Sequence, residues 1–574
     1  MRKQWQLRNP DPRTVQTLGQ QLACSPLLAR LLAIRGVQSK AEADRFLNPS
    51  LHTLAPPWVL AGMDAAVQRI HAALIAHEKI LVYGDYDADG ITATAVLTAF
   101  LRQCGAHVSY HIPHRAIDGY GLGVDFIKKR ARRNGVNLII TVDCGSSDHE
   151  AIRLARQAGI HTIVTDHHPV AQVPPDALAV INPTRPDCPA GLSHLAGVGV
   201  AFYLTIALRT HLRSQRFWQN RSEPNLSRLC DLVALGTIAD VAPLVDENRV
   251  LTAAGLQQIN HGARPGLAAL MHASLKAARP ADAQAIAFSL APRLNAAGRL
   301  AHARMACELL LTDNDQKAAH LAAALCRLNV RRQSMENALL DSILQQLPRP
   351  PDRMNRAVLV VEGRQWHEGL LGIVAARLTR RFNRPTAVIS TRNGLSKGSA
   401  RSIDGIDIAA ALKACTGLLD RCGGHPLAAG FSLPAAQVAA FKTRLEQVVG
   451  QMAPHHDADP IVMMDAAVPL DDITPELMNH IERLAPFGQG NPYPLFMDTG
   501  IRVRQCTILG QRHRRMLLEG PCGGGRQHPA IQFNVSGDLS PGDQFEKIAY
   551  RPQWNYWNGR KQLQLVVENT HPVA

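Results

Sequence analysis

The sequence contains no CxxC pair, no long apolar run and no fixed-period repeat. Its eleven cysteines are scattered over 574 residues, so their spacing indicates neither a zinc ribbon nor a dithiol redox motif. It has no uncharged stretch of about 18 residues that would predict a membrane span, and its start, MRKQWQLRNPDPRT, lacks the apolar run of a secretory signal. We therefore expect a cytoplasmic protein in a reducing compartment, with no membrane partner.

Positive charge is in excess. The 62 Lys and Arg residues exceed the 47 Asp and Glu residues, which gives a net charge of +15. This balance favours a polyanionic partner, although it also fits an ordinary basic soluble protein. With 46% hydrophobic and 19% charged residues, the chain has the composition of a globular protein. Its length predicts about two to four domains.

Short apolar runs alternate with helical patterns between about residues 79 and 183: KILVYG, TATAVLTAFLRQCG, VSYHIP, NLIITVD, HTIVTD and ALAVINP. This rhythm predicts a parallel sheet built from β-α-β units. The polar segments GDYDADG, VDCG and TDHH each follow directly on a β-rich run. Because ligands bind at the carboxyl ends of strands in open parallel sheets, we expect these segments to converge.

The rest of the chain predicts further domains. Residues 315–347 contain no Gly or Pro, and as one helix they would extend roughly 50 Å. A second α/β pattern follows PRPPDR, and after about residue 455 short β-like runs predict a small β-barrel. We therefore predict an α/β fold with five parts: a helical extension that packs on the first domain (1–78), the parallel-sheet domain (79–314), a connecting helix (315–347), a smaller α/β domain (348–454) and a β-barrel (455–574).

The segment GDYDADG places Asp85, Asp87 and Asp89 at alternate positions. Loops use this pattern to aim several carboxylates at one hard cation. An EF-hand begins in the same way, but it needs a bidentate Glu at its twelfth position, where this chain has Val96. A β-run rather than a helix also precedes the loop, so the EF-hand interpretation is excluded.

Four further candidate ligands and a neighbouring acid follow in other segments. Asp143 lies in TVDCG, Asp166, His167 and His168 lie in TDHHPV, and Asp240 lies in LGTIADVAPL. Singly, each is explained as a helix-capping acid or a surface histidine. Together they predict a carboxylate and imidazole site, which suits Mn²⁺ or Mg²⁺ better than a thiolate zinc site. Two such ions would support phosphodiester hydrolysis, and Asp143, alone at its strand end, is the predicted bridging carboxylate.

The order of motifs resembles one known family. GDYDADGITATAVL, ITVDCGSSDHEAI, VTDHHPV, LAGVGVAFY, LVALGTIADVAPL and PRLNAAGRL look like the successive motifs of the RecJ family in the DHH phosphoesterase superfamily. CGGHPLAAGFSL is similar to the signature of the DHHA1 domain, and PFGQGNPYPLF resembles the segment that leads into the OB-like domain of the family. The resemblance implies a DHH domain, a DHHA1 domain and an OB-like barrel. It also implies a 5′-to-3′ exonuclease on single-stranded DNA that depends on two Mn²⁺ or Mg²⁺ ions, releases 5′-mononucleotides and acts in recombination and repair.

The resemblance also implies roles for single residues. The residues that would surround the metal ions are Asp85, Asp87, Asp89, Asp143, His167 and Asp240. Asp143, His168 and Asp166 form the predicted catalytic group. In this group His168 would face the scissile phosphate, and Asp166 would orient the turn that carries the histidines.

A phosphate pocket is the second implied site. Arg115, Arg299, Ser399 and Arg401 would bind the 5′-terminal phosphate, because guanidinium groups hold phosphate oxygens bidentately and a hydroxyl adds a donor. Each Arg has the alternative of a surface salt bridge. His425 would contact the substrate, unless the glycines before it only form a turn beside which it packs.

The C-terminal segment QWNYWNGRK leaves two interpretations open. Trp554, Tyr556 and Trp557 would stack on bases of a single strand, or they would alternate into the core of a hairpin with its turn at Asn558-Gly559.

Two other functions are alternatives to the exonuclease. A DHH phosphodiesterase on pyrophosphate, short oligonucleotides or cyclic dinucleotides would be shorter, and a non-catalytic replication scaffold would lack several of the acids present here. The predicted partners are single-stranded DNA, a single-strand-binding protein and a helicase, and the chain is predicted to be a monomer.

Overall fold

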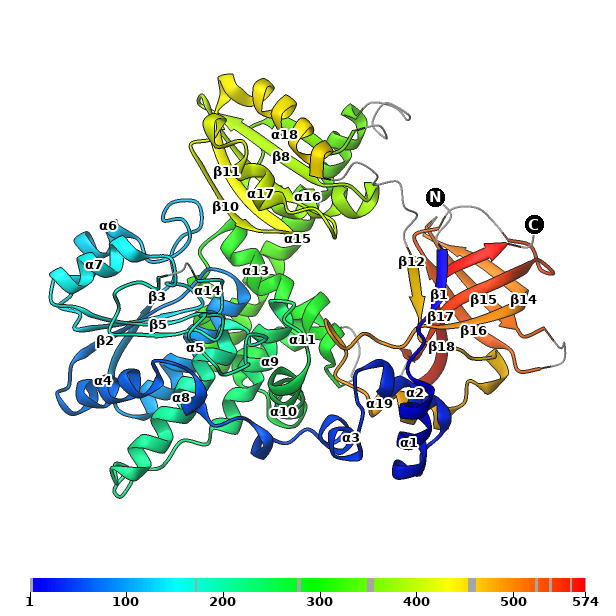
Figure 1. Cartoon of the computed structure of the whole chain (residues 1–574), viewed down its shortest axis with the longest axis horizontal. Coiled ribbons are helices and arrows are strands. Elements are labelled where there is room, and N and C mark those ends of the chain that lie inside the picture. The colour runs from blue at the N-terminus through cyan, green and yellow to red at the C-terminus, as the bar shows by residue number, and fades with distance from the viewer. Residues whose placement is uncertain are drawn as a thin grey trace.

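The computed structural model describes residues 4–170, 173–275, 280–347, 356–452, 461–510, 512–521, 525–535, 539–557 and 560–572. The described chain forms three lobes, of which two are α/β domains joined by a long helix and the third contains a β-barrel (Figure 1). The predicted fold class is confirmed. Among the described residues, no helix combines the length and the apolar character needed to cross a membrane.

The first domain is built on a fully parallel sheet with the strand order β3-β2-β4-β5-β6. The chain leaves β2 for β3 on one side and returns to β4 on the other, so the order reverses between β2 and β4. Ligand crevices lie at such switch points, beyond the carboxyl ends of the strands. The strands are β2 (Lys79–Tyr83), β3 (His107–His111), β4 (Leu138–Val142), β5 (His161–Thr165) and β6 (Ala179–Ile181).

Apolar side chains leave both faces of this sheet. Val82 and Ile140 pack into the large core shared with α5 and α8, and Leu81 and Ile139 pack into a smaller core shared with α7. Continuous apolar strands of this kind are typical of a parallel sheet that is covered on both faces. The helices of this domain are α4 (Met63–Ile75), α5 (Ala88–Gln103), α6 (Val124–Phe126), α7 (His149–Gln157), α8 (Gly197–Ser214), α9 (Cys230–Ala239), α10 (Asp246–Gly262), α11 (Pro265–Ser274), α12 (Ala283–Ala285), α13 (Ala291–Leu300) and α14 (Arg304–Leu311).

Helix α15 (Asp315–Gln346) joins the two α/β domains. Its 32 residues extend about 48 Å at 1.5 Å per residue. Ala318 and Leu325, near its start, pack into the core of the first domain, whereas Leu340 and Ile343, near its end, pack into the second. The two domains are therefore anchored to opposite ends of one rigid element.

The second domain has a mixed sheet with the order β10-β11-β9-β8-β7. Only β7 and β8 are parallel, and the other neighbours are antiparallel. Its elements are β7 (Leu359–Arg364), α16 (Glu368–Phe382), β8 (Thr386–Arg392), β9 (Leu395–Arg401), α17 (Ile408–Lys413), β10 (Arg421–His425), β11 (Ala428–Pro434) and α18 (Val438–Met452).

The third lobe is a barrel. Its strands follow the order β13-β14-β15-β16-β18-β17, and a further pairing of β14 with β17 closes the sheet. The elements are β12 (Ile461–Met464), β13 (Ala466–Ala467), α19 (Pro475–Glu482), β14 (Phe496–Leu509), β15 (His513–Glu519), β16 (His528–Phe533), β17 (Gln544–Trp557) and β18 (Arg560–Pro572). The predicted turn at Asn558-Gly559 and the side chain of Trp557 lie outside the described residues. Trp554 packs at the edge of the barrel core, with the Nζ of Lys561 4.3 Å from its ring centroid.

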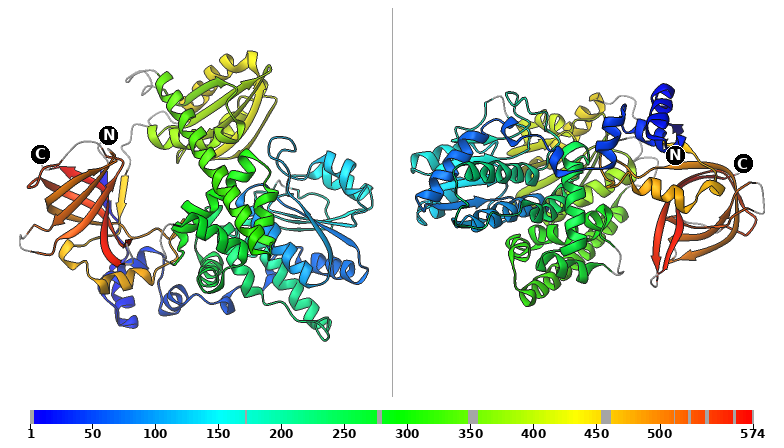
Figure 2. Two further views of the ribbon diagram at one scale, coloured as in Figure 1. Left: turned by 180° about the vertical axis from the view of Figure 1, so that it is seen from behind. Right: turned by 90° about the horizontal axis from the view of Figure 1, so that it is seen from below.

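The N-terminal segment requires a correction. The extension 1–78 was predicted to pack on the first domain, but Leu18, Leu28 and Leu32 share a core with the barrel. They lie in α1 (Pro12–Leu22) and α2 (Pro26–Ile34), which α3 (Lys40–Leu47) follows. Strand β1 (Gln4–Leu7) pairs in parallel with β12, and of the extension's α-helices only α4 enters the core of the first domain. The first and the last described residues therefore lie in one lobe (Figure 2).

Candidate metal centre

The loop after β2 carries three carboxylates, each with a different environment. Asp87 begins α5, because its side chain accepts hydrogen bonds from the backbone N–H groups of Asp89 and Gly90 at 3.0 and 3.1 Å. Asp85 is buried against Gly90, where a Cβ atom would lie 2.6 Å from the backbone nitrogen of Asp85. The tight loop therefore requires glycine at this position.

Asp89 points toward the start of α8. Its carboxylate accepts hydrogen bonds from the backbone N–H groups of Gly197 and Val198 at 2.7 and 2.9 Å. The positive end of the helix dipole stabilises a negative charge there. The motif LAGVGV thus contributes backbone donors rather than side chains.

Asp143 follows the last residue of β4 and has a left-handed backbone, with φ at +61°. Aspartate tolerates this conformation better than most residues. Its side chain is only 2% exposed, and a Cβ atom on Gly197 would lie 2.5 Å from Asp143 Oδ1. A glycine at the start of α8 is what allows the helix to approach this carboxylate.

Asp166 is buried and forms hydrogen bonds to the turn that carries His167 and His168, here called the histidine turn. Its Oδ1 accepts hydrogen bonds from the backbone N–H of His167 at 2.8 Å and pairs with His168 Nδ1 at 2.8 Å, and its Oδ2 accepts from the backbone N–H of Ser146 at 3.0 Å. Burial opposes ionisation, but the bond to His168 lowers the pKa of Asp166 to about 2. Burial likewise opposes charge on His168, yet Asp166 raises its pKa to about 9.

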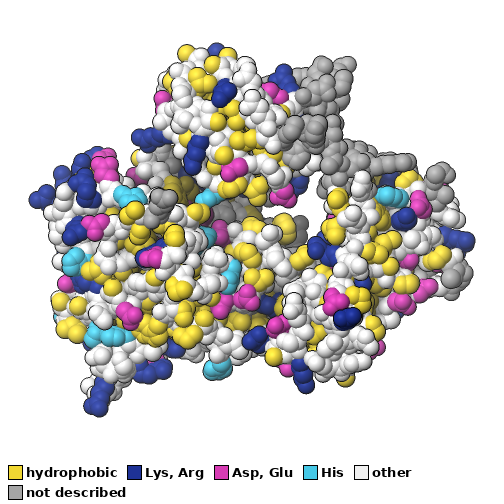
Figure 3. All heavy atoms as spheres, viewed as in Figure 1, with side chains coloured by type: hydrophobic (Ala, Val, Ile, Leu, Met, Phe, Trp, Pro, Cys, Tyr) yellow, Lys and Arg dark blue, Asp and Glu magenta, His cyan; other side chains and the backbone are white. Residues whose placement is uncertain are grey.

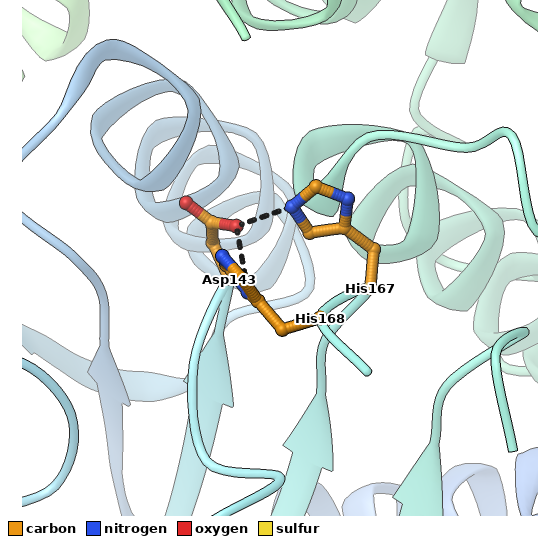
Figure 4. Close-up of side chains that lie close together, drawn as sticks. All are labelled: Asp143, His167 and His168. Carbon is orange, nitrogen blue, oxygen red and sulfur yellow. Dashed lines mark ion pairs between the residues drawn. The ribbon is translucent and has the colours of Figure 1, made fainter. Parts of the chain in front are cut away.

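His167 lies at the centre of the cluster. Its Nε2 is 3.2 Å from Asp143 Oδ1, 3.8 Å from Asp89 Oδ2 and 3.9 Å from Asp240 Oδ2. Figure 4 shows both histidines facing Asp143, whose Oδ1 is also 3.9 Å from His168 Nδ1. Burial, aided by the charge of His168, lowers the pKa of His167 to about 4. His167 is therefore a neutral imidazole, the form that binds metal ions.

The candidate ligand atoms form three groups, in each of which all atoms lie within 4.8 Å of one another. Asp143 and His167 each belong to two groups, so the groups are joined. The groups are Asp85, Asp87 and Asp143; Asp143, His167 and His168; and Asp89, His167 and Asp240. The structure therefore brings together all six predicted metal-binding residues.

The cluster fits divalent cations. Asp85 Oδ1 and Asp143 Oδ1 are buried and accept no hydrogen bond. Burial and neighbouring carboxylates raise the pKa of both groups, and they raise the pKa of Asp89 to about 7 and that of Asp240 to about 8. Hard cations such as Mn²⁺ and Mg²⁺ would balance this excess of negative charge and are suited to the carboxylate oxygens.

The predicted phosphate pocket gathers residues from both α/β domains. Arg299, near the end of α13, donates a hydrogen bond to the carbonyl of Gly369 in the second domain at 3.1 Å. Arg401 donates to Ser399 Oγ at 3.1 Å, and the guanidinium of Arg115 lies 5.0 Å from the centroid of the Tyr86 ring.

These three arginines carry an excess of positive charge. Burial lowers the pKa of Arg299 to about 10 and also lowers that of Arg401, and the charge of Arg115 adds to both shifts. In the described part of the chain, none of the three forms a salt bridge with a carboxylate. A Cβ atom on Gly372 would lie 2.8 Å from Arg401 Nη2, so this glycine leaves room for the guanidinium.

His425 brings the second domain into contact with the histidine turn of the first. It ends β10 in the second domain, and its ring is stacked at 5.9 Å on that of His168 in the first. In the space-filling view, histidine side chains are visible at the boundary between the two α/β domains (Figure 3). The five predicted substrate-contacting residues thus belong either to the cluster of arginines with Ser399 or to the contact between His425 and His168.

Two residues near the histidines were not predicted from the sequence. The hydroxyl of Tyr120 lies 3.1 Å from His168 Nδ1 and 3.3 Å from the carbonyl of Asp143. The amide of Asn182 donates to Ser146 Oγ at 2.9 Å and to the carbonyl of His168 at 2.8 Å. Asn182 follows β6 directly, so the rule that polar residues gather at carboxyl ends of parallel strands would have found it. No comparable signal marks Tyr120.

Comparisons with known proteins agree with this geometry. The model of the DHH family, N-terminal domain, matches residues 79–237, the DHHA1 domain matches 355–451, and the RecJ OB domain matches 464–569. The single-stranded-DNA-specific exonuclease RecJ of Escherichia coli K12 is 38% identical over 588 residues, which cover 100% of both chains.

Solved structures are similar as well. RecJ from Thermus thermophilus in complex with Mn²⁺ has a TM-score of 0.84 and 32% identity, covering 100% of this chain and 80% of its own. Its complex with Mg²⁺ has a TM-score of 0.78 and 31% identity, covering 100% and 79%. These two metals are the ones that the carboxylate and imidazole ligands predict. With all three domains matched and the whole length covered, the chain belongs to the RecJ family of single-stranded-DNA-specific exonucleases.

Proposed function

We propose that this protein is a metal-dependent exonuclease that digests single-stranded DNA from the 5′ end, releases 5′-mononucleotides and acts in recombination and repair. The observation that carries the proposal is the opposite charge of two neighbouring clusters. A cluster of carboxylates and imidazoles lies beside three arginines that, among the described residues, form no salt bridge with a carboxylate. Cations in one cluster and a terminal phosphate in the other would balance both.

The metal ions would bind in the cluster of carboxylates and imidazoles. Asp85, Asp87, Asp89, Asp143, His167 and Asp240 would hold two Mn²⁺ or Mg²⁺ ions, with Asp143 shared between them. When bound, such ions polarise a phosphate group and lower the pKa of a water molecule.

The protein's own groups complete the reaction. Burial opposes charge on His168, but its hydrogen bond to Asp166 favours the protonated form and raises its pKa. With Nδ1 held by Asp166, its Nε2–H is left to donate to an oxygen of the scissile phosphate. Asp166 therefore acts by orienting and charging His168.

The arginine cluster would set the direction of digestion. Arg115, Arg299, Ser399 and Arg401 would bind the 5′-terminal phosphate, and His425 would contact the nucleotide beside it. A strand anchored by its 5′ end would present its first phosphodiester bond to the metal cluster. The same proposal includes the five domain boundaries, with the N-terminal correction above, a cytoplasmic location, action as a monomer, and contacts with a single-strand-binding protein and a helicase.

One assay tests this proposal. Single- and double-stranded DNA labelled at the 5′ or the 3′ end is incubated with Mn²⁺ or Mg²⁺, with the wild type beside Asp143→Ala. We expect immediate release of the 5′ label as a mononucleotide from the single strand, and no release by the variant. Equal digestion of blunt duplex, or earlier release of the 3′ label, would contradict the proposal.

A further inference from the structure

The end of helix α9 has an uncommon residue at a strained position. Asp240 caps the helix, and Val241 follows with φ at +59°. The backbone N–H of Val241 donates to the carbonyl of Ile238, and that of Ala242 donates to the carbonyl of Thr237, both at 3.2 Å. This is the Schellman arrangement, in which the left-handed position after the cap is usually glycine.

Valine is poorly suited to this position. A left-handed backbone brings Cβ close to the carbonyl oxygen, and for β-branched residues it is a true outlier. Within the ranges that the structure describes, Val241 is the only β-branched residue with positive φ. Packing does not offset the strain, because the side chain is 66% exposed. The geometry of the turn would account for a glycine at position 241, but it does not account for an exposed isopropyl group there.

The location of Val241 suggests what offsets the strain. Its neighbour Asp240 lies 3.9 Å from His167, within the metal cluster. Two other exposed side chains with apolar surface lie on segments that meet this cluster: Tyr120, whose hydroxyl contacts His168, and Leu427, which follows two residues after His425, whose ring stacks on His168. Backbone strain of this kind concentrates at functional sites, where a bound ligand depends on it.

We propose that Val241 is a substrate-contacting residue, and that its isopropyl group packs against the face of an unstacked nucleobase next to the scissile phosphate. This inference rests on the proposed function, because it needs a polynucleotide at the site. A single strand exposes the faces of its bases, whereas a duplex hides them in its stack. An apolar contact at this position therefore favours a single strand over a duplex.

A binding experiment tests the contact without catalysis. Fluorescence anisotropy in EDTA measures binding of two 5′-phosphorylated, 3′-labelled chains, oligo(dT) and an abasic analogue. The proteins are the wild type, Val241→Ala, Val241→Gly and the control Ile75→Ala. Ile75 is equally exposed, at 65%, but it ends α4 just before β2 and therefore lies at the amino end of the sheet, away from the site.

We expect both Val241 variants to bind oligo(dT) roughly three- to tenfold more weakly, since they lose most of one small apolar contact. Their affinity for the abasic chain, and both affinities of Ile75→Ala, should equal those of the wild type. The midpoint of thermal unfolding of Val241→Gly should be unchanged or higher, because glycine relieves the strain.

Three results would overturn the inference. Unchanged affinity for oligo(dT) would show that there is no contact, and an equal loss on the abasic chain would show that the contact is not with a base. A lower midpoint for Val241→Gly would assign the side chain to folding. Failure of the wild type to digest a single strand with Mn²⁺ would instead overturn the proposed function. A missing Val241 effect with digestion intact would overturn only this inference.

Discussion

The metal cluster and the arginine cluster of the site differ in the sign of the charge that each leaves unbalanced. In the metal cluster of the first domain, burial and like charges raise the pKa values of Asp85, Asp89, Asp143 and Asp240. In the arginine cluster, which combines Arg115 and Arg299 of the first domain with Arg401 of the second, burial and like charges lower the pKa values of Arg299 and Arg401. The charge of Arg115 favours the ionised form of Asp85, but among the described residues no salt bridge joins the two clusters.

This difference shows how the site is assembled for its ligands. If the carboxylates and the arginines formed salt bridges, neither metal ions nor a phosphate would find free charges. Helix α15 instead joins the two domains, and His168 of the histidine turn stacks on His425 of the second domain. The charge of each cluster is thus left for an external partner.

The largest effect is expected from the removal of a carboxylate of the metal cluster. Asp143→Asn keeps the shape of the side chain but removes the carboxylate common to two ligand groups. We expect kcat on single-stranded DNA to fall by on the order of a thousandfold, because the ligands act as a unit. Rates of mononucleotide release in saturating Mn²⁺ measure it. Circular dichroism is the control for folding, and a fall of less than tenfold would show that Asp143 is not shared.

A smaller effect is expected from a substitution in the arginine cluster. Arg401→Ala should lower the preference for a 5′-phosphorylated over a 5′-hydroxyl strand by about tenfold, since a charge-assisted bidentate contact is lost. Competition between the two substrates measures this ratio. Arg401→Lys should be intermediate, because an ammonium binds as a point charge.

The matched control for Arg401→Ala is Arg392→Ala, which removes the same charge. Arg392 is exposed and ends β8, where it pairs with Leu395 at the opposite end of β9 from Arg401. Its variant should keep the wild-type preference. If both variants lose it equally, general charge rather than a pocket recognises the end.

The smallest effect concerns stability. Millimolar Mn²⁺ should raise the unfolding midpoint of the wild type by a few degrees, in a concentration-dependent way, because ions that bind only the folded state stabilise it. Asp143→Asn should show a smaller rise. In EDTA its midpoint should equal or exceed that of the wild type, since it removes a charge from a buried group of carboxylates. Equal shifts in both proteins would indicate that Mn²⁺ binds elsewhere.

Local patterns were sufficient for much of the fold and the site. The three polar segments of the first domain could be placed because each follows an apolar run, and carboxyl ends of parallel strands meet at one edge. The long helix 315–347 differs from α15 by one residue, since nothing in its sequence interrupts a helix. The roles given to single residues stay predictions, although the structure brings those residues together.

Contacts between distant segments could not be predicted in this way. The apolar faces of the N-terminal helices do not identify the domain that they cover, and only the tertiary structure shows that they share the core of the barrel, next to the pairing of β1 with β12. Likewise, Tyr120 lies in a loop with no periodic pattern, and its hydroxyl meets His168 only because two loops fold over the same strand ends.

The chemical groups of the metal cluster could be read from the sequence, because these groups stand in short segments whose position after a strand is a local property. Only the fold brings Arg299 and Arg401, 102 positions apart, close enough for the charge of Arg401 to lower the pKa of Arg299. It also decided that an exposed valine ends α9 beside Asp240 in a left-handed backbone. The physical reason is that burial, charge and strain depend on what surrounds a residue in space.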